Sequence, residues 1–246
     1  MPLAHRIEAA SAALPASCDV AGVAALLADP GRTAILSAVL DGRALPAGEL
    51  ARIAGVSPAT ASAHLARLVD GGLLVAERHG RHRYFRLASE SVAHAIETLA
   101  TVARPRVAAT AKEAYVVNGI RFARSCYDHL AGRLGVEVVA ALVAREALVY
   151  DERGFSPGEA AGKYFGALGV DLDTVTETSR RSRRRLTREC LDWSERRLHL
   201  AGALGAALLG SLLEREWLTR FPNGRMLQVT NDGRRGFRRE LGIVTV

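Results

Sequence analysis

Cysteine and histidine side chains in the C-terminal half have the chemistry to bind a metal or to react with an oxidant. Cys126 and His129 stand at an i, i+3 spacing, which would place both on one face of a predicted helix. A second group precedes an apolar helix and consists of Cys190, Asp192, Trp193 and His199. Thiolate and imidazole are ligands for zinc and other soft metals, and a thiol can also sense oxidants. All six residues are candidate sensor residues, although each can instead be a packing or hydrogen-bonded side chain, and the metal stays unknown.

The same thiols could serve as nucleophiles, with His129 or His199 as base. The sequence shows no Gly-rich phosphate cradle and no third residue at a recognisable spacing to orient the base. We therefore expect that the protein is not an enzyme. Three widely spaced cysteines argue against a disulfide framework and fit a reducing compartment. No signal-peptide pattern or membrane-length apolar run is present, which predicts a cytoplasmic protein without a membrane partner.

Two further features of the second half have more than one interpretation. Trp193 and Trp217 could line an apolar ligand pocket together with a leucine stripe, although such a stripe is more often core. That stripe consists of Leu200, Leu204 and Leu208. The arginine run 180–188 could touch phosphates or could be a solvated helix or linker. No cofactor is required by the sequence, and a metal ion or a small-molecule inducer both remain open.

A helix-turn-helix pattern lies in the first hundred residues. A short helix opens at Pro46, and Gly55-Val56-Ser57 separates it from a longer helix over 58–70. Ser57 supplies an N-cap oxygen and Pro58 needs no hydrogen-bond donor at the first helical position. The second helix therefore has a well-defined start, as a helix that enters DNA requires.

The outer face of this second helix is small and polar. Ala61, Leu65 and Leu68 recur at i, i+4 and i+7 and should point inward. The opposite face can enter the major groove, where hydroxyls and imidazole meet base edges or phosphates and alanine meets a thymine methyl. The predicted DNA contacts here are Ser57, Ala59, Thr60, Ser62, Ala63, His64 and Arg67.

A basic β-hairpin follows. Two short apolar segments, 73–75 and 84–87, flank a run of arginine and histidine. Its tip should lie along phosphates or enter the minor groove. The predicted contacts of this wing are Arg78, His79, Arg81, His82 and Arg83.

Together these elements resemble the ArsR/SmtB family of winged-helix repressors over about residues 20–103. The resemblance is carried by several ordered segments, namely Leu27–Arg32, Glu49-Leu50-Ala51, Ser57–Leu65, Gly72-Leu73-Leu74 and Gly80-Arg81. It implies a homodimer that binds a double-stranded operator and releases it when an inducer binds. Positions 46–54 hold no cysteine, and the later helix offers only His94 and Glu97, so neither usual metal pattern of the family is intact.

The fold class expected is mainly α with small β-hairpins, of the α+β kind. We expect a flexible arm over 1–16, a winged helix-turn-helix domain over 17–103 and a helical C-terminal dimerisation or sensor domain over 104–246, for which a winged-helix-like fold is one alternative. The last domain contains long helical segments, including 107–134, and an internal repeat of about 136–172 with 205–243.

The predicted function is that of a sequence-specific transcription regulator, an inducer-responsive repressor that binds an inverted-repeat operator as a dimer. The net charge of +7 suits a polyanionic partner, but the first 104 residues hold ten arginines against nine acidic residues, so bulk charge is weak evidence. The alternatives are an architectural DNA-binding protein without an inducer, and a thiol or metal sensor that acts through Cys126 and Cys190.

Overall fold

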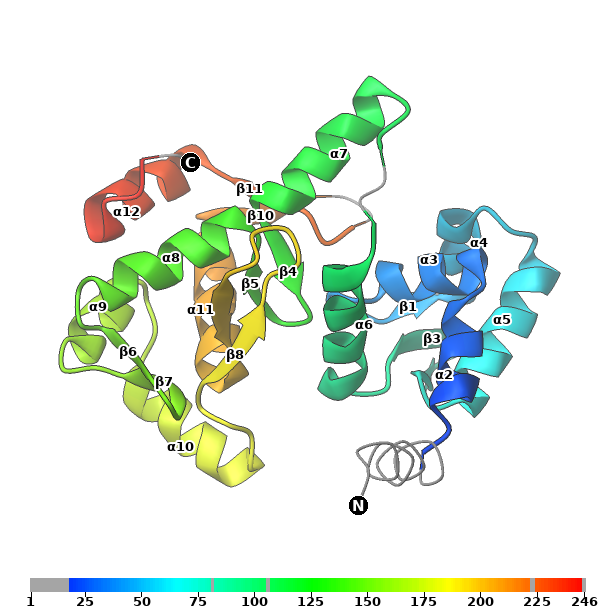
Figure 1. Ribbon diagram of the computed structural model, residues 1–246, viewed down its shortest axis with the longest axis horizontal. Coiled ribbons are helices and arrows are strands. Elements are labelled where there is room, and N and C mark those ends of the chain that lie inside the picture. Colours follow the sequence, from blue (N-terminus) through cyan, green and yellow to red (C-terminus); the bar gives the residue numbers. More distant parts are fainter. Residues whose placement is uncertain (1–17, 81, 105–106, 222–223, 245–246) are drawn as a thin grey trace, which may run out of the picture. The chain divides into compact units, whose positions relative to one another are not determined.

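The computed structural model describes residues 18–80, 82–104, 107–221 and 224–244 (Figure 1). Contacts between residues divide the chain into two compact units, 1–89 and 90–246. The observed boundary differs from the predicted one at 103, because the helix that begins at Glu90 belongs to the second unit. The predicted arm over 1–16 and the predicted DNA contact Arg81 lie outside the described residues.

The first unit is a winged helix-turn-helix. Its helices are α2 (Val20–Leu27), α3 (Pro30–Ala38), α4 (Ala47–Ala54) and α5 (Pro58–Asp70). Its antiparallel sheet has the order β1-β3-β2 and consists of β1 (Leu45–Pro46), β2 (Leu74–His79) and β3 (His82–Leu87). The predicted fold class, with small hairpins and an N-terminal winged helix, is confirmed.

Local signals fix the helix-turn-helix. Gly55 has φ +66°, a left-handed conformation that ends α4 and that glycine adopts without strain. Ser57 then caps α5, because its Oγ accepts from the backbone N–H of Thr60 at 3.1 Å. The helix is anchored by Leu65 and Leu68, which are buried as predicted. Its outer face is therefore left free of core packing.

In its described residues, the second unit combines helices with four two-stranded antiparallel hairpins. Its helices are α6 (Glu90–Val102), α7 (Ala111–Phe122), α8 (Arg133–Val143), α9 (Ala161–Ala167), α10 (Leu172–Ser182), α11 (Gly202–Glu214) and α12 (Asn231–Leu241). Its hairpins are β4 (Arg124–Cys126) with β5 (His129–Ala131), β6 (Leu148–Asp151) with β7 (Gly154–Pro157), β8 (Arg188–Leu191) with β9 (Leu198–Ala201), and β10 (Leu218–Arg220) with β11 (Leu227–Val229). Among the described residues, no helix has the length and apolar character needed to cross a membrane.

The prediction of one long helix over 107–134 is wrong after Phe122, where α7 ends and the chain enters the hairpin β4–β5. Tyr127 has φ +59° in the turn, and Gly132 has φ +82° where β5 ends. A Cβ on Gly132 would lie 2.8 Å from the backbone oxygens of Arg121 and Phe122. The glycine therefore allows a close backbone approach that folds the hairpin back onto the end of α7, which local helix propensity could not predict.

The second unit repeats one motif of a hairpin, a helix, a second hairpin and a helix. The first copy runs from β4 to α9, and the second runs from β8 to α12, with α10 between them. The repeat thus begins upstream of the segments proposed from sequence, 136–172 and 205–243. Each copy starts with the pattern Arg-x-Cys-x-Asp, at 124–128 and 188–192, followed by His-Leu-Ala-Gly at 129–132 and 199–202. The apolar faces of α8 and α11 lie in one shared hydrophobic core.

Candidate functional site

The outer face of α5 is open and carries small side chains. Ala61, Leu65 and Leu68 are at most 2% exposed, which leaves the opposite face to solvent. Its two hydroxyls make local hydrogen bonds: Thr60 Oγ1 lies 2.8 Å from Ser57 Oγ, and Ser62 donates to the carbonyl of Pro58 at 2.9 Å. Four further predicted contacts are on the exposed face or at its start, namely Ser57, Ala59, Ala63 and Arg67.

His64 differs from the other predicted contacts of α5. Its side chain is only 13% exposed, and Nε2 lies 3.5 Å from Oδ1 of Asp29, the N-cap of α3. A Cβ on Gly31 would meet the same imidazole at 3.0 Å. The ring is thus held between α5 and the start of α3, where it can fix the angle between these helices.

The wing places basic residues opposite each other. Arg78 pairs with Arg83 across β2 and β3, and His79 pairs with His82, next to the turn. All four side chains are exposed. Directly opposed like charges destabilise a hairpin unless an anion lies beside them. Arg86, further from the tip, is neutralised by Glu77, whose Oε1 is 2.6 Å from Arg86 Nε.

Four of the predicted sensor residues meet in the second unit. We call them the cysteine-histidine cluster, and they are Cys126, His129, Cys190 and His199. All four side chains are buried, and their candidate ligand atoms lie within 4.8 Å of one another. They come from hairpins and not from the predicted helix: Cys126 faces His129 across β4 and β5, and Cys190 faces His199 across β8 and β9.

Polar atoms in this cluster lack ordinary partners. His129 Nε2 and both ring nitrogens of His199 are buried without a hydrogen bond. The two sulfur atoms are 3.8 Å apart. The neighbouring Cys126 thiol, with a smaller contribution from the charge of His199, lowers the pKa of Cys190, whereas the contact with Cys190, together with burial, raises the pKa of Cys126.

The other two predicted sensor residues lie beside the cluster. Asp192 Oδ2 accepts from Arg124 Nη2 at 2.9 Å and from the backbone N–H of Gly132 at 2.7 Å. Trp193 stacks under the guanidinium of Arg124, with Cζ 4.6 Å from the ring centroid. Both residues therefore hold the surrounding backbone and charges in place.

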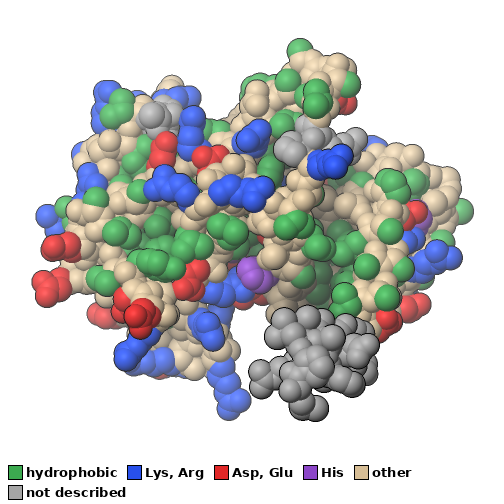
Figure 2. Space-filling model, viewed as in Figure 1, with side chains coloured by type: hydrophobic (Ala, Val, Ile, Leu, Met, Phe, Trp, Pro, Cys, Tyr) green, Lys and Arg blue, Asp and Glu red, His purple; other side chains and the backbone are tan. Residues whose placement is uncertain are grey.

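The apolar pocket considered from sequence is core. Leu200, Leu204, Leu208 and Trp217 are all buried in the shared hydrophobic cluster. The cavity beside Leu200 and Leu208 has a volume of about 10 Å³, too small for a ligand. The arginine run is partly neutralised, because Arg184 pairs with Asp128 at 2.7 Å and Arg188 pairs with Glu90 at 2.7 Å. Other arginines of the run remain at the surface near α10, and a separate set of arginines lies at the surface along α12 (Figure 2).

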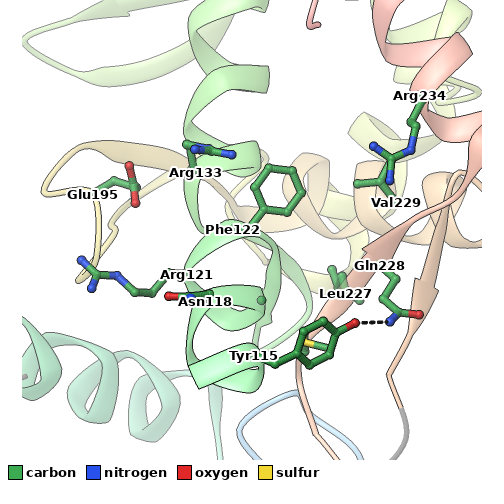
Figure 3. A pocket seen from close by; sticks show the side chains of 12 residues that line it. Tyr115, Asn118, Arg121, Phe122, Arg133, Glu195, Leu227, Gln228, Val229 and Arg234 are labelled. Carbon is green, nitrogen blue, oxygen red and sulfur yellow. Dashed lines mark hydrogen bonds between the residues drawn. The ribbon is translucent and has the colours of Figure 1, made fainter. Parts of the chain in front are cut away.

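An open pocket of about 790 Å³ was missed by the sequence analysis. Figure 3 shows side chains from α7, α8, β11, α12 and the β8–β9 loop around it. Tyr115 Oη accepts from Gln228 Nε2 at 3.2 Å on one side. Its charged lining residues are Arg121, Arg133, Arg234 and Glu195, so cationic groups predominate. Separate segments supply these residues, which is why no local motif indicated the pocket.

Comparison with known proteins places the first unit among DNA-binding domains. Residues 27–77 match a family model described as a helix-turn-helix domain. The HTH-type transcriptional regulator CmtR of Mycobacterium tuberculosis is 42% identical over 76 residues, which cover 31% of this chain and 64% of CmtR. A solved winged helix-turn-helix fragment of Mb0332 from Mycobacterium bovis is homodimeric and is described as a possible ArsR-family regulator. It is 36% identical to this chain, with a TM-score of 0.32. The match covers 34% of this chain and 76% of the fragment.

One relative matches both units. The uncharacterized HTH-type transcriptional regulator YdfF of Bacillus subtilis (strain 168) is 42% identical over 225 residues. That match covers 92% of this chain and 98% of YdfF. The chain therefore belongs to the HTH-type transcriptional regulators, in the family that includes YdfF.

Proposed function

We propose that the protein is a cytoplasmic repressor that binds an inverted-repeat operator as a homodimer and responds to an effector. The observation that carries the proposal is the open face of α5, which is anchored by a buried leucine side and bears only small or polar groups outside. A helix of this kind can approach base edges closely in the major groove.

The predicted contacts then divide by chemistry. Thr60 and Ser62 can exchange their local hydrogen bonds for base edges or phosphates, and Ala59 and Ala63 can contact thymine methyl groups. Arg67 reaches a base or a phosphate. Ser57 acts chiefly as the helix cap, and His64 acts as a positioning residue for α5.

The wing supplies the phosphate contacts. Arg78 and Arg83 are opposed across the hairpin, and their mutual repulsion is relieved when the tip lies along a phosphate backbone. This arrangement favours DNA as the partner over simple solubility, because solubility does not require like charges in register.

The effector site belongs to the second unit in this proposal. The pocket of about 790 Å³ is lined by three arginines against one glutamate, which suits a small anionic effector. An architectural protein without an effector is the alternative, and the two differ in their specificity for one DNA sequence.

Selection of bound duplexes from a random DNA pool by the full-length protein tests the proposal. We expect enrichment of an inverted repeat whose half-sites are centred about 10 base pairs apart, or a multiple of that distance. Thr60→Ala should relax the preference at one base pair in each half-site, while the exposed Arg180→Ala should leave the motif unchanged. An asymmetric motif, or no enrichment, would overturn the proposal.

A further inference from the structure

We propose that the cysteine-histidine cluster binds one zinc ion in a tetrahedral site that joins the two repeats of the second unit. The inference is independent of DNA binding, because it concerns the internal assembly of this unit. It specifies two thiolates and two imidazoles as the complete ligand set.

The spacing of the sulfur atoms matches the proposed geometry. A tetrahedral zinc ion holds each thiolate sulfur at about 2.3 Å, so two sulfur ligands lie about 3.8 Å apart. Cys126 Sγ and Cys190 Sγ are separated by 3.8 Å. Because all four ligand atoms also lie within 4.8 Å of one another, one ion can contact every member.

Each histidine ring has one nitrogen near a carboxylate, which leaves the other nitrogen for a metal ion. His129 Nδ1 lies 3.3 Å from Asp128 Oδ1, and His199 Nδ1 lies 3.6 Å from Asp192 Oδ2. Metal-binding histidines usually direct one ring nitrogen to a carboxylate and the other to the metal. We therefore assign Nε2 of each ring as the ligand atom.

Burial supplies a second, independent argument. Nε2 of His129 and Nε2 of His199 are buried and have no hydrogen-bond partner. A buried polar atom without a partner is costly, and a metal ion removes that cost for both rings at once. Two thiolates also balance the two positive charges of zinc, so the loaded site is neutral in an interior where a net charge would be unfavourable.

The internal repeat explains why the ligands occur in two matched pairs. The cysteine faces the histidine across the two strands of each hairpin, and an aspartate stands two residues after each cysteine. Neither repeat supplies more than two of the four ligands, so a closed tetrahedral site requires both copies. Zinc would thus cross-link β4–β5 to β8–β9, with loss of the two thiol protons on binding.

Native mass spectrometry of the full-length protein without a histidine tag, purified under reducing conditions and supplied with zinc, tests this inference. We expect each chain to gain about 63 Da, the mass of one zinc ion less two protons. Replacement by Co²⁺ should give the visible absorption bands and thiolate charge-transfer band of a tetrahedral site. A zinc-free chain with two reduced thiols would overturn the inference, as would a chain about 2 Da lighter with a Cys126–Cys190 disulfide.

Variants identify the ligands. Cys190→Ser should lose the zinc and the cobalt bands, whereas Cys18→Ser, which removes the exposed cysteine of the first unit, should keep one ion per chain. If Cys190→Ser kept a full complement of zinc, the assigned site would be wrong. Because the stoichiometry and cobalt spectrum are measured on the unaltered protein as well, a variant that fails to fold does not decide the outcome.

Discussion

Arg124 donates from Nη2 to Oδ2 of Asp192 over 2.9 Å, and neither side chain has any exposed surface. Arg124 belongs to β4 of the first repeat, while Asp192 follows β8 of the second. Glu97 of α6 places Oε2 3.7 Å from the same nitrogen and also pairs with Arg225. A buried ion-pair network therefore joins both repeats and α6 beside the cysteine-histidine cluster.

Removal of Arg124 should destabilise the second unit strongly. Arg124→Ala leaves the buried carboxylate of Asp192 without its arginine partner and leaves Glu97 paired with Arg225 alone. Breaking a buried ion pair in this way costs about 3–5 kcal/mol. Urea unfolding followed by tryptophan fluorescence measures the loss, since both tryptophans lie in this unit. The exposed Arg180→Ala should stay within about 0.5 kcal/mol of the parent protein. Equal stability of the two variants would refute the structural role of the network.

The glycines after β5 and β9 should be intolerant of a side chain. Gly132 and Gly202 have φ +82° and +85°, and a Cβ at either would lie within 3.0 Å of backbone atoms. We expect backbone strain to lower the free energy of unfolding by about 1–3 kcal/mol or more in each of the variants Gly132→Ala and Gly202→Ala. Gly210→Ala in α11 meets no atom within 4 Å and should stabilise by up to about 1 kcal/mol. Thermal unfolding measures the stability of the three variants. If Gly210→Ala were as strongly destabilised as Gly132→Ala and Gly202→Ala, the steric role of the two glycines would be wrong.

The wing should contribute to affinity through phosphates. Arg78→Ala removes one charge from the opposed pair at the tip, so binding should weaken on all duplexes by a similar factor. The slope of log Kd against log salt should fall by about 0.9 for each lost phosphate contact. Fluorescence anisotropy at several salt concentrations measures both effects. Arg52→Ala, on α4, is the control for loss of one positive charge in the same unit. If the slope of log Kd against log salt changed in Arg52→Ala but not in Arg78→Ala, the wing would not be the phosphate contact.

Asp29 should make the first unit sensitive to acid. The backbone N–H of Arg32 donates to its carboxylate at 2.8 Å and lowers the pKa, with a smaller contribution from the charge of His64. A folded-state pKa below the unfolded value adds stability above the unfolded pKa, and this stability is lost as pH falls through the folded pKa. Asp29→Asn, which keeps a capping oxygen, should be less stable than the parent at neutral pH and should approach it in acid. If the difference in stability between Asp29→Asn and the parent protein did not change with pH, this assignment would be wrong. Asp70→Asn, at an exposed position, is the control.

The DNA-binding unit could be predicted from sequence because its signals are local. Gly55, Ser57 and Pro58 specify a turn, a cap and a first helical residue within four positions, and each adopts the expected conformation. The position of His64 could not be predicted, because its partner Asp29 lies on another helix. Helix spacing alone shows which face is outward but not which polar side chain folds back on a neighbour.

The residues of the cluster were identified from sequence as possible metal ligands, but on helices and not on hairpins. Cys126 and His129 are three apart, a spacing that fits one face of a helix and also the two sides of a tight hairpin. Close backbone packing at Gly132 favours the hairpin, and that packing depends on the rest of the unit. The repeated pattern at 124–132 and 188–202 was the available signal, since it places equivalent cysteines and histidines in two copies of one motif.

The ratio of dissociation constants for a selected duplex and a scrambled duplex of equal length tests the proposed regulatory function most directly. At about 150 mM salt, a sequence-specific regulator should bind the selected duplex at least about a thousandfold more tightly. A ratio near one would contradict specific recognition by α5 and would indicate an architectural protein that covers DNA without regard to sequence.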